Sequence, residues 1–211
     1  MRKNPSNKTN KKNNTDNKDG FIRLISGKWR GKKLLVKNLA GLRPTTNRTK
    51  ETLFNWLMHD IRDANCLDCF SGSGSLGFEA LSRFAKHVQL IEQNSTVSKQ
   101  LHANAQQLNA PNISIIEDDC IKYLQQTASQ RFDIVFVDPP FNNDLIQPCC
   151  NSLENNGYLS DNALIYIEME SNISKLTLPK NWTLLKEKKT KQVIYQLYSH
   201  ATITLEIISP E

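Results

Sequence analysis

The segment DCFSGSGSLG, from Asp68 to Gly77, decides the fold class of this chain. It begins near the end of an apolar run, residues 64–70, which is typical of a buried parallel strand. A second segment, DPPF from Asp138 to Phe141, follows another such run, residues 132–137. Open α/β sheets bind ligands beyond the carboxyl ends of their strands, so we expect both segments at one ligand-binding edge.

Strand-like and helix-like segments alternate from residue 64 onward. We predict strands near residues 64–70, 87–92, 112–117, 132–137 and 163–169, and helices near residues 76–85, 94–108, 119–127 and 144–156. From Trp182 to Ile208 the pattern is strand-like without a helix, which indicates an antiparallel pair that closes the sheet. This order predicts an α/β fold with a doubly wound, mostly parallel sheet and an antiparallel C-terminal hairpin.

Length and composition exclude several classes of protein. The 211 residues are enough for one ordinary domain with an appendage. No apolar run approaches the roughly 18 residues that a membrane span needs, and the first twenty residues lack the apolar core of a secretory signal. Five cysteines without framework spacing are typical of a reducing compartment. We therefore expect a cytoplasmic protein without a membrane partner, and we expect a monomer.

Cysteine and histidine spacings give no metal-binding motif. Cys66 and Cys69 form a C-x-x-C pair at the end of a strand, and the four histidines occur singly. We expect the cysteines to be small buried hydrophobic residues, with no bound metal. No Ser/His/Asp arrangement indicates a nucleophile.

Positive charge is concentrated at the amino terminus. Residues 1–50 hold 15 Lys and Arg side chains against two Asp, whereas the other 161 residues hold 12 basic and 19 acidic side chains. A basic arm on an acidic body indicates a polyanionic partner, and nucleic acid fits best. Residues 1–20 are rich in Asn and Lys, so we expect a disordered tail that gives solubility or diffuse attraction.

The segment FIRLISGKWRGKKLLV, residues 21–36, predicts a β-hairpin because two strand-like runs flank Gly27 and Gly31. Basic side chains around an exposed aromatic ring suit RNA, since the cations meet phosphates and the ring can stack on a base. Trp29 is a packing residue instead if its ring is buried, and the sequence leaves both possibilities open. The side chains near the predicted tip are Lys28, Trp29, Arg30, Lys32 and Lys33.

A turn followed by a helix is predicted in GLRPTTNRTKETLFNWLMHDI, residues 41–61. The apolar positions on one face of this helix are Leu53, Phe54, Leu57, Met58 and Ile61. The cations at its amino-terminal approach, Arg43, Arg48 and Lys50, oppose the helix dipole, so helix stability alone does not explain them. We predict an RNA-binding extension over residues 21–50 and a catalytic domain over residues 51–211.

The glycine segment has the spacing of a nucleotide-cofactor loop. Gly72, Gly74 and Gly77 satisfy G-x-G-x-x-G, and Glu92 follows Gly72 by twenty residues at the end of the next strand. This pattern alone fits either NAD or S-adenosylmethionine. Asp68 favours S-adenosylmethionine, because its charge attracts a cationic amino acid moiety and repels a pyrophosphate. The DPPF segment also has no use in hydride transfer, and no P-loop motif is present.

Three segments together resemble a known family: RPTTNRTKETLFN (residues 43–55), DCFSGSGSLGFEALSR (residues 68–83) and VDPPF (residues 137–141). They are similar to the RsmD family of 16S rRNA (guanine(966)-N(2))-methyltransferases, with the basic ISGKWRGKKL segment in the expected place before them. The resemblance covers roughly residues 21–200. It implies a seven-stranded, Rossmann-like class I methyltransferase with S-adenosylmethionine as its cofactor. It also implies that 16S rRNA within a protein-bound small ribosomal subunit is the substrate.

The resemblance also implies roles for the donor-binding residues. The backbone of Gly72 and Gly74 lines the methionine moiety, Asp68 meets its ammonium group, and Glu92 accepts hydrogen bonds from the ribose hydroxyls. Asp119 accepts from the adenine amino group, although Asp118 stays a second possibility, and the amide of Cys120 donates to the adenine ring. The expected cofactor-binding residues are Asp68, Phe70, Gly72, Gly74, Gly77, Glu92, Asp119 and Cys120.

The expected catalytic residues are Asp138, Pro139, Pro140 and Phe141. The carboxylate of Asp138, helped by the Pro139 carbonyl, accepts a hydrogen of the guanine amine and localises its lone pair. Phe141 stacks on the flipped base. The expected RNA-binding residues are Lys28, Trp29, Arg30, Lys32, Lys33, Arg43, Thr45 and Arg48.

Three other functions stay open at this point. DNA adenine-N6 methylation is an alternative because such enzymes share DPPF. An NAD-dependent oxidoreductase and a non-catalytic RNA-binding assembly factor are the other two, and neither would transfer a methyl group.

Overall fold

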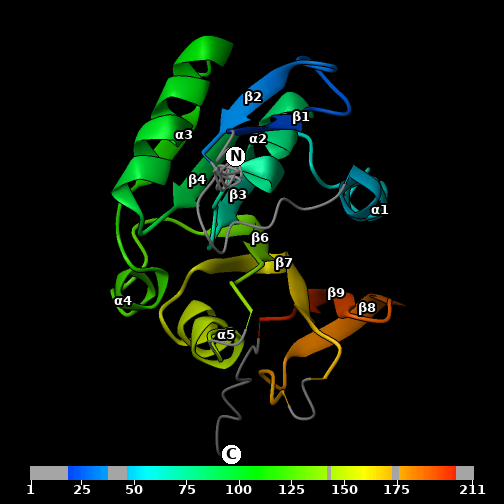
Figure 1. Cartoon of the computed structure of the whole chain (residues 1–211). Coiled ribbons are helices and arrows are strands. Elements are labelled where there is room, and N and C mark those ends of the chain that lie inside the picture. Colours follow the sequence, from blue (N-terminus) through cyan, green and yellow to red (C-terminus); the bar gives the residue numbers. More distant parts are fainter. Residues whose placement is uncertain (1–18, 38–46, 142–143, 173–175, 203–211) are drawn as a thin grey trace, which may run out of the picture.

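The computed structural model describes residues 19–37, 47–141, 144–172 and 176–202 of the chain. The strands of its large sheet are β3 (Asn65–Asp68), β4 (His87–Ile91), β5 (Ile113–Ile116), β6 (Phe132–Val137), β7 (Leu159–Glu170), β8 (Trp182–Lys189) and β9 (Val193–His200). They lie in the order β5-β4-β3-β6-β7-β9-β8 (Figure 1). The first five strands of that order pair in parallel and the last two pair antiparallel. The predicted sheet with an antiparallel C-terminal hairpin is confirmed.

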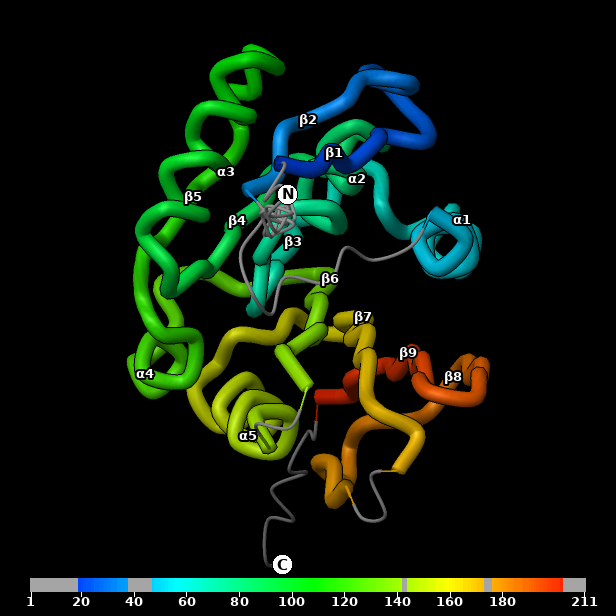
Figure 2. Tube along the Cα trace, viewed as in Figure 1, coloured from blue at the N-terminus to red at the C-terminus, as the bar shows by residue number. Residues whose placement is uncertain are grey.

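Helices cover both faces of this sheet. They are α1 (Asn47–Trp56), α2 (Ser75–Ser82), α3 (Ser95–Leu108), α4 (Cys120–Leu124) and α5 (Ile146–Asn155). The first three share one hydrophobic core with the sheet, and α4 and α5 share the other. Figure 2 shows α2 and α5 on opposite sides of the strands. No helix in the described part of the chain has the length and apolar character that a membrane crossing requires.

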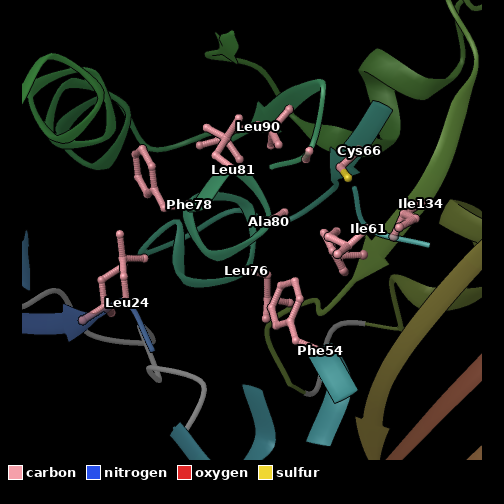
Figure 3. Close-up of a cluster of buried hydrophobic side chains, with 14 of the residues drawn as sticks. Leu24, Phe54, Ile61, Cys66, Leu76, Phe78, Ala80, Leu81, Leu90 and Ile134 are labelled. Carbon is pink, nitrogen blue, oxygen red and sulfur yellow. The ribbon is translucent and has the colours of Figure 1, made fainter. Parts of the chain in front are cut away.

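The two cores follow from the alternation of side chains along each strand. In β6, Ile134 and Phe136 belong to the core under α1 and α2, whereas Val135 and Val137 belong to the core under α4 and α5. The ring centroids of Phe54 in α1 and Phe136 lie 6.1 Å apart, so α1 packs directly on the sheet. Figure 3 shows Phe54 among the buried side chains of this core, with Leu76 of α2 and Ile134 of β6. Strands buried on both faces explain why the sequence reads as short apolar runs.

The predicted N-terminal hairpin is confirmed as β1 (Gly20–Arg23) and β2 (Lys33–Val36), which pair antiparallel. It docks on α2 through backbone donors. The N–H groups of Ile25 and Ser26 donate to Glu79 Oε2 and Oε1, at 2.8 and 3.1 Å. The hairpin therefore shares its core with the sheet domain.

Trp29 is buried at 6% exposure, so the expectation of an exposed stacking ring is wrong. The cause is the docking of the hairpin tip on the end of α2. The N–H of Lys28 donates to the Ser82 carbonyl (2.7 Å), and the N–H of Trp29 donates to Ser82 Oγ (3.1 Å). A Cβ at Gly27 would overlap the Ser82 carbonyl, which shows how closely the two backbones approach. Trp29 is the packing residue that the sequence left as an alternative.

Helix α1 departs from its predicted apolar face at Met58, and the position of Lys50 in it was not predicted. It ends at Trp56, and Met58 in the following turn is 59% exposed, because the chain no longer keeps the helical period there. Lys50 is 1% exposed, and its Nζ donates to the Arg23 carbonyl (2.6 Å) and lies 3.9 Å from Glu79 Oε2. Lys50 therefore ties α1 to the hairpin and to α2, in agreement with the expectation that helix stability alone does not explain this cation.

Candidate active site

The glycine segment turns sharply between β3 and α2. Gly72 and Gly74 have φ values of 46° and 72°, a region that favours glycine. The N–H of Gly72 donates to Glu92 Oε2 (2.9 Å), and the N–H of Gly74 donates to the Ser71 carbonyl (2.6 Å). At Gly77, a Cβ would overlap Leu90 and lie 3.2 Å from Val88 Cγ1. The glycines thus permit a tight turn and a close contact between α2 and β4.

Two carboxylates flank this loop. Asp68, 2% exposed at the end of β3, accepts from the N–H of Gly77 through Oδ2 (3.2 Å). Burial, reinforced by the nearby charge of Glu92, raises the pKa of Asp68 to about 7. Glu92 accepts from Gly72 through Oε2 and from the N–H of Asn94 through Oε1 (2.7 Å), and burial raises its pKa as well. Both acids are therefore positioned to take up a cationic or hydroxyl-bearing ligand.

The next pair of acids lies at the start of α4. Asp119 is the N-cap of this helix, and its Oδ1 accepts from the N–H of Lys122 (2.9 Å). Asp118 Oδ1 accepts from Lys122 Nζ (3.0 Å), and this bond lowers the pKa of Asp118. Lys122 thus engages the Asp118 side chain at the surface. The Asp119 side chain is held by the helix that begins beside it.

The cysteines are buried, as expected, but three of them also form a cluster. The sulfur atoms of Cys69, Cys120 and Cys149 all lie within 4.8 Å of one another. Hydrogen bonds from Cys149 and Cys69 lower the pKa of the Cys120 thiol below its usual value. The three residues come from the end of β3, from α4 and from α5, so no sequence spacing could have indicated this cluster.

The DPPF segment lies next to the glycine segment. In the register of β3 and β6, Asp68 pairs with Phe136, and the N–H of Cys69 donates to the Phe136 carbonyl (3.0 Å). Asp138 is therefore two residues beyond the strand position that faces Asp68. Asp138 and Phe141 are half-buried, Pro139 is buried and Pro140 is exposed. The prediction that both segments lie at one edge of the sheet is confirmed.

A cavity of about 390 Å³ opens near the same edge, between α1 and the β8–β9 hairpin. We call it the α1–β8–β9 cavity. Its cations are Arg48, Lys188 and Lys189, and its aromatic residues are Trp56, Tyr166 and Tyr195. Only Arg48 was among the expected RNA-binding residues. The other five residues were not predicted from the sequence because the cavity joins segments far apart in the chain, such as Arg48 and Lys188, which are 140 positions apart.

The expected RNA-binding residues of the N-terminal hairpin do not line this cavity. Lys28, Arg30, Lys32 and Lys33 are exposed on the N-terminal hairpin. Arg43 and Thr45 lie outside the residues that the structure describes. The hairpin cations are thus accessible to a polyanion, although the tryptophan between them is not.

Comparison with known proteins identifies the family. The family described as "Conserved hypothetical protein 95" matches residues 22–199. The chain is 51% identical to "Ribosomal RNA small subunit methyltransferase D" of Escherichia coli K12, over 85% of this chain and 90% of that protein. It is 50% identical to the protein of the same name from Haemophilus influenzae, over 90% of this chain and 100% of that one.

A solved structure agrees with these relatives. The Escherichia coli structure named "Putative methyltransferase yhhF" is 50% identical to the chain and superposes with a TM-score of 0.81. It covers 86% of this chain and 99% of that one. The match of sequence, fold and length over most of the protein leaves one assignment: the chain belongs to the RsmD family of ribosomal RNA small-subunit methyltransferases.

Proposed function

We propose that this protein transfers a methyl group from S-adenosylmethionine to the exocyclic N2 amine of a guanine in 16S rRNA of the bacterial small ribosomal subunit. The observation that carries this proposal is the register of β3 and β6, which sets the glycine loop beside DPPF. Family membership supports ribosomal RNA as the substrate. The chain acts as a cytoplasmic monomer, and its RNA substrate is already bound by ribosomal proteins.

The loop and its acids fit S-adenosylmethionine, which supplies an electrophilic methyl group on a sulfonium sulfur. The positive-φ backbone of Gly72 and Gly74 forms the turn against which the methionine moiety lies. Asp68 holds the ammonium group, whose charge compensates the buried carboxylate beside the N–H of Gly77. Glu92 is already oriented by two loop amides, so it can accept from the ribose hydroxyls without moving.

The adenine lies between Phe70 and the start of α4. Asp119 accepts from the adenine amino group with the carboxylate oxygen that does not cap the helix, and the amide of Cys120 donates to the ring. We assign this role to Asp119 because the side chain of Asp118 is ion-paired with Lys122 at the surface. Gly77 contributes indirectly, since it lets α2 pack close enough to β4 to hold the loop.

The DPPF residues perform the transfer. The guanine amine is a weak nucleophile because its lone pair is delocalised into the ring. Asp138 and the Pro139 carbonyl accept its hydrogens and localise that lone pair, while Phe141 stacks on the base and Pro140 stiffens the turn. The amine nitrogen bonds to the methyl carbon as the carbon–sulfur bond breaks, and the proton leaves to Asp138 or to water. In-line positioning at about 3 to 3.5 Å supplies much of the rate.

The test is methyl transfer from labelled donor to small subunits, naked 16S rRNA or DNA, followed by mapping of the modified base. We expect N2-methylguanine, formed preferentially on subunits. The Asp138→Ala variant should lose about 100-fold or more in turnover at saturating donor, since its hydrogen bond matters chiefly in the transition state. Asp161→Ala, an exposed aspartate on β7, is the control. N6-methyladenine in DNA, or full single-turnover rates for Asp138→Ala, would contradict the proposal.

A further inference from the structure

We propose that the α1–β8–β9 cavity binds the single-stranded RNA next to the target guanine, with its cations on phosphates and its aromatic residues against a base. This inference rests on the proposed function and assigns it a second RNA contact, distinct from the N-terminal hairpin. Four features of the cavity support it: position, charge, aromatic lining and the contrast with a neighbouring lysine.

The cavity lies beside the predicted catalytic carboxylate. Tyr166, which lines the cavity, pairs in the β6–β7 register with Phe136, two residues before Asp138. Burial, and then the charges of Glu168 and Asp138, raise the pKa of Tyr166, in keeping with this register. An RNA strand whose guanine reaches Asp138 therefore passes the mouth of this cavity.

The charged residues that line the cavity are all cations. Lys188 is half-buried, and its Nζ donates to Thr52 Oγ1 of α1 (3.0 Å), a neutral group that aims the ammonium without compensating its charge. Arg48 is exposed on α1, one helical turn before Thr52. Lys189 Nζ forms an ion pair with Glu187 Oε1 (3.2 Å), so we expect Lys189 to contribute less to phosphate binding. Cations placed in this way match the phosphates of a nucleic acid.

The aromatic residues are held in fixed orientations. The rings of Tyr195 and Tyr166 are nearly parallel, at 10°, with centroids 6.5 Å apart. Thr49 Oγ1 donates to the hydroxyl oxygen of Tyr195 (3.2 Å), which fixes the outer ring against α1. Trp56 borders the same space and is half-buried. A base can stack on such a ring whatever its sequence, because every base offers a π face.

Edge strands often carry lysines that only prevent aggregation, and β8 is the edge of this sheet. Lys186 fits that description, since it is exposed and does not line the cavity. Lys188 lies two residues further along the same strand, yet it contacts α1 and lines the cavity. Lys186→Gln is therefore a matched control, with the same charge change on the same strand.

The experiment measures affinity for small subunits over a salt series, together with methylation rate and binding of S-adenosylhomocysteine. Lys188→Gln should weaken subunit binding about threefold or more and reduce the salt slope by roughly 0.7, the value of one phosphate contact on a single strand. Tyr195→Ala should weaken it by roughly five-fold or more through lost stacking, and Tyr195→Phe should restore most of that loss. S-adenosylhomocysteine binding should match wild type in all variants.

The outcomes separate this inference from the proposed function. If Lys188→Gln and Lys186→Gln show the same affinity and salt slope, the cavity does not bind RNA, even if the wild-type enzyme methylates guanine normally. If the wild-type protein binds RNA through Lys188 and Tyr195 but methylates no guanine, the cavity assignment stands and the proposed function fails. Loss of S-adenosylhomocysteine binding in Lys188→Gln would also overturn the inference, because the effect would then not be confined to RNA.

Discussion

The two antiparallel hairpins of this protein, β1–β2 and β8–β9, look alike in sequence and differ in what they do. Both carry lysines and aromatic residues, in KWRGKK (residues 28–33) and in the stretch from LLKEKK to IYQLY (residues 184–198). The tip of the first is anchored to Glu79 and Ser82 of α2, so its tryptophan is buried. The second leaves Lys188 and Tyr195 at the wall of a cavity. The composition of a hairpin therefore predicts binding less well than the tertiary contacts that its backbone makes.

Helix α1 lies between the two hairpins and contacts both. Lys50 donates to the Arg23 carbonyl of β1, whereas Thr52 accepts from Lys188 of β8. Residues only two positions apart thus reach opposite neighbours, because they lie on different faces of the helix. Helix α1 therefore connects the N-terminal hairpin to the β8 strand that lines the cavity.

The largest effect is expected from Glu79, the anchor of the first hairpin. Glu79→Ala removes the acceptor for two backbone N–H groups and leaves Lys50 as a buried charge without its carboxylate. We expect a loss of about 3 to 5 kcal/mol in the free energy of unfolding, measured with denaturant. Glu51→Ala, an exposed acid on α1, is the control. A loss below about 1 kcal/mol would mean that the anchor does not hold the hairpin.

Replacing Trp29 or Tyr195 with alanine tests the comparison of the two hairpins directly. Trp29→Ala should cost about 3 kcal/mol of stability, as expected for a buried ring, and leave the salt slope of subunit binding unchanged. Tyr195→Ala, at a half-buried position, should cost less stability and weaken subunit binding. Chemical denaturation and the salt series give both readouts. If the Trp29→Ala variant folds but binds subunits as weakly as Tyr195→Ala, the two hairpins do not differ in RNA binding as we propose.

The glycines of the first hairpin give a smaller effect with an internal control. Gly27 and Gly31 both have positive φ, 76° and 86°, so alanine is strained at either site by about 1 kcal/mol. Only at Gly27 would the Cβ overlap the backbone of Ser82, whereas at Gly31 the nearest atom is 3.9 Å away. We expect Gly27→Ala to be less stable than Gly31→Ala by about 2 kcal/mol. Equal stabilities would show that the tip can leave α2 at little cost.

The smallest effect concerns the donor site, which neither hairpin contacts in our proposal. Burial raises the pKa of Asp68 to about 7, so its stabilising effect on folding holds at low pH and is lost as the pH rises through 7. A bound ammonium group needs the charged form, so donor affinity should change in the opposite sense. We expect S-adenosylhomocysteine to bind roughly tenfold more tightly near pH 8 than near pH 6.

Calorimetry on Asp68→Asn provides the control for that pH dependence. The variant should bind weakly at both pH values, and any slope that persists should come from Glu92, whose pKa is also raised. A wild-type protein with the same affinity at both pH values would exclude Asp68 from contact with the ammonium group.

Local sequence patterns were enough to predict the strands, the helices and the glycine loop of this protein. The apolar runs before Asp68 and Asp138 predicted the strands, and the glycine spacing predicted the loop, because period and backbone freedom are properties of short segments. Each strand and helix that these patterns predicted is present within a few residues. Since parallel strands place their carboxyl ends together, the juxtaposition of the two segments also followed from sequence.

Which side chains are buried, and which of them share a site, depends on the packing of segments that lie far apart in the sequence. Trp29 is covered because Glu79 and Ser82, more than fifty residues away, accept from the hairpin backbone. The α1–β8–β9 cavity exists because the order of strands brings residues 48–56 against residues 188–195. The physical reason is the same in both cases: burial depends on long-range packing, and a lysine or a tryptophan has the same local pattern on a core surface as on a binding surface.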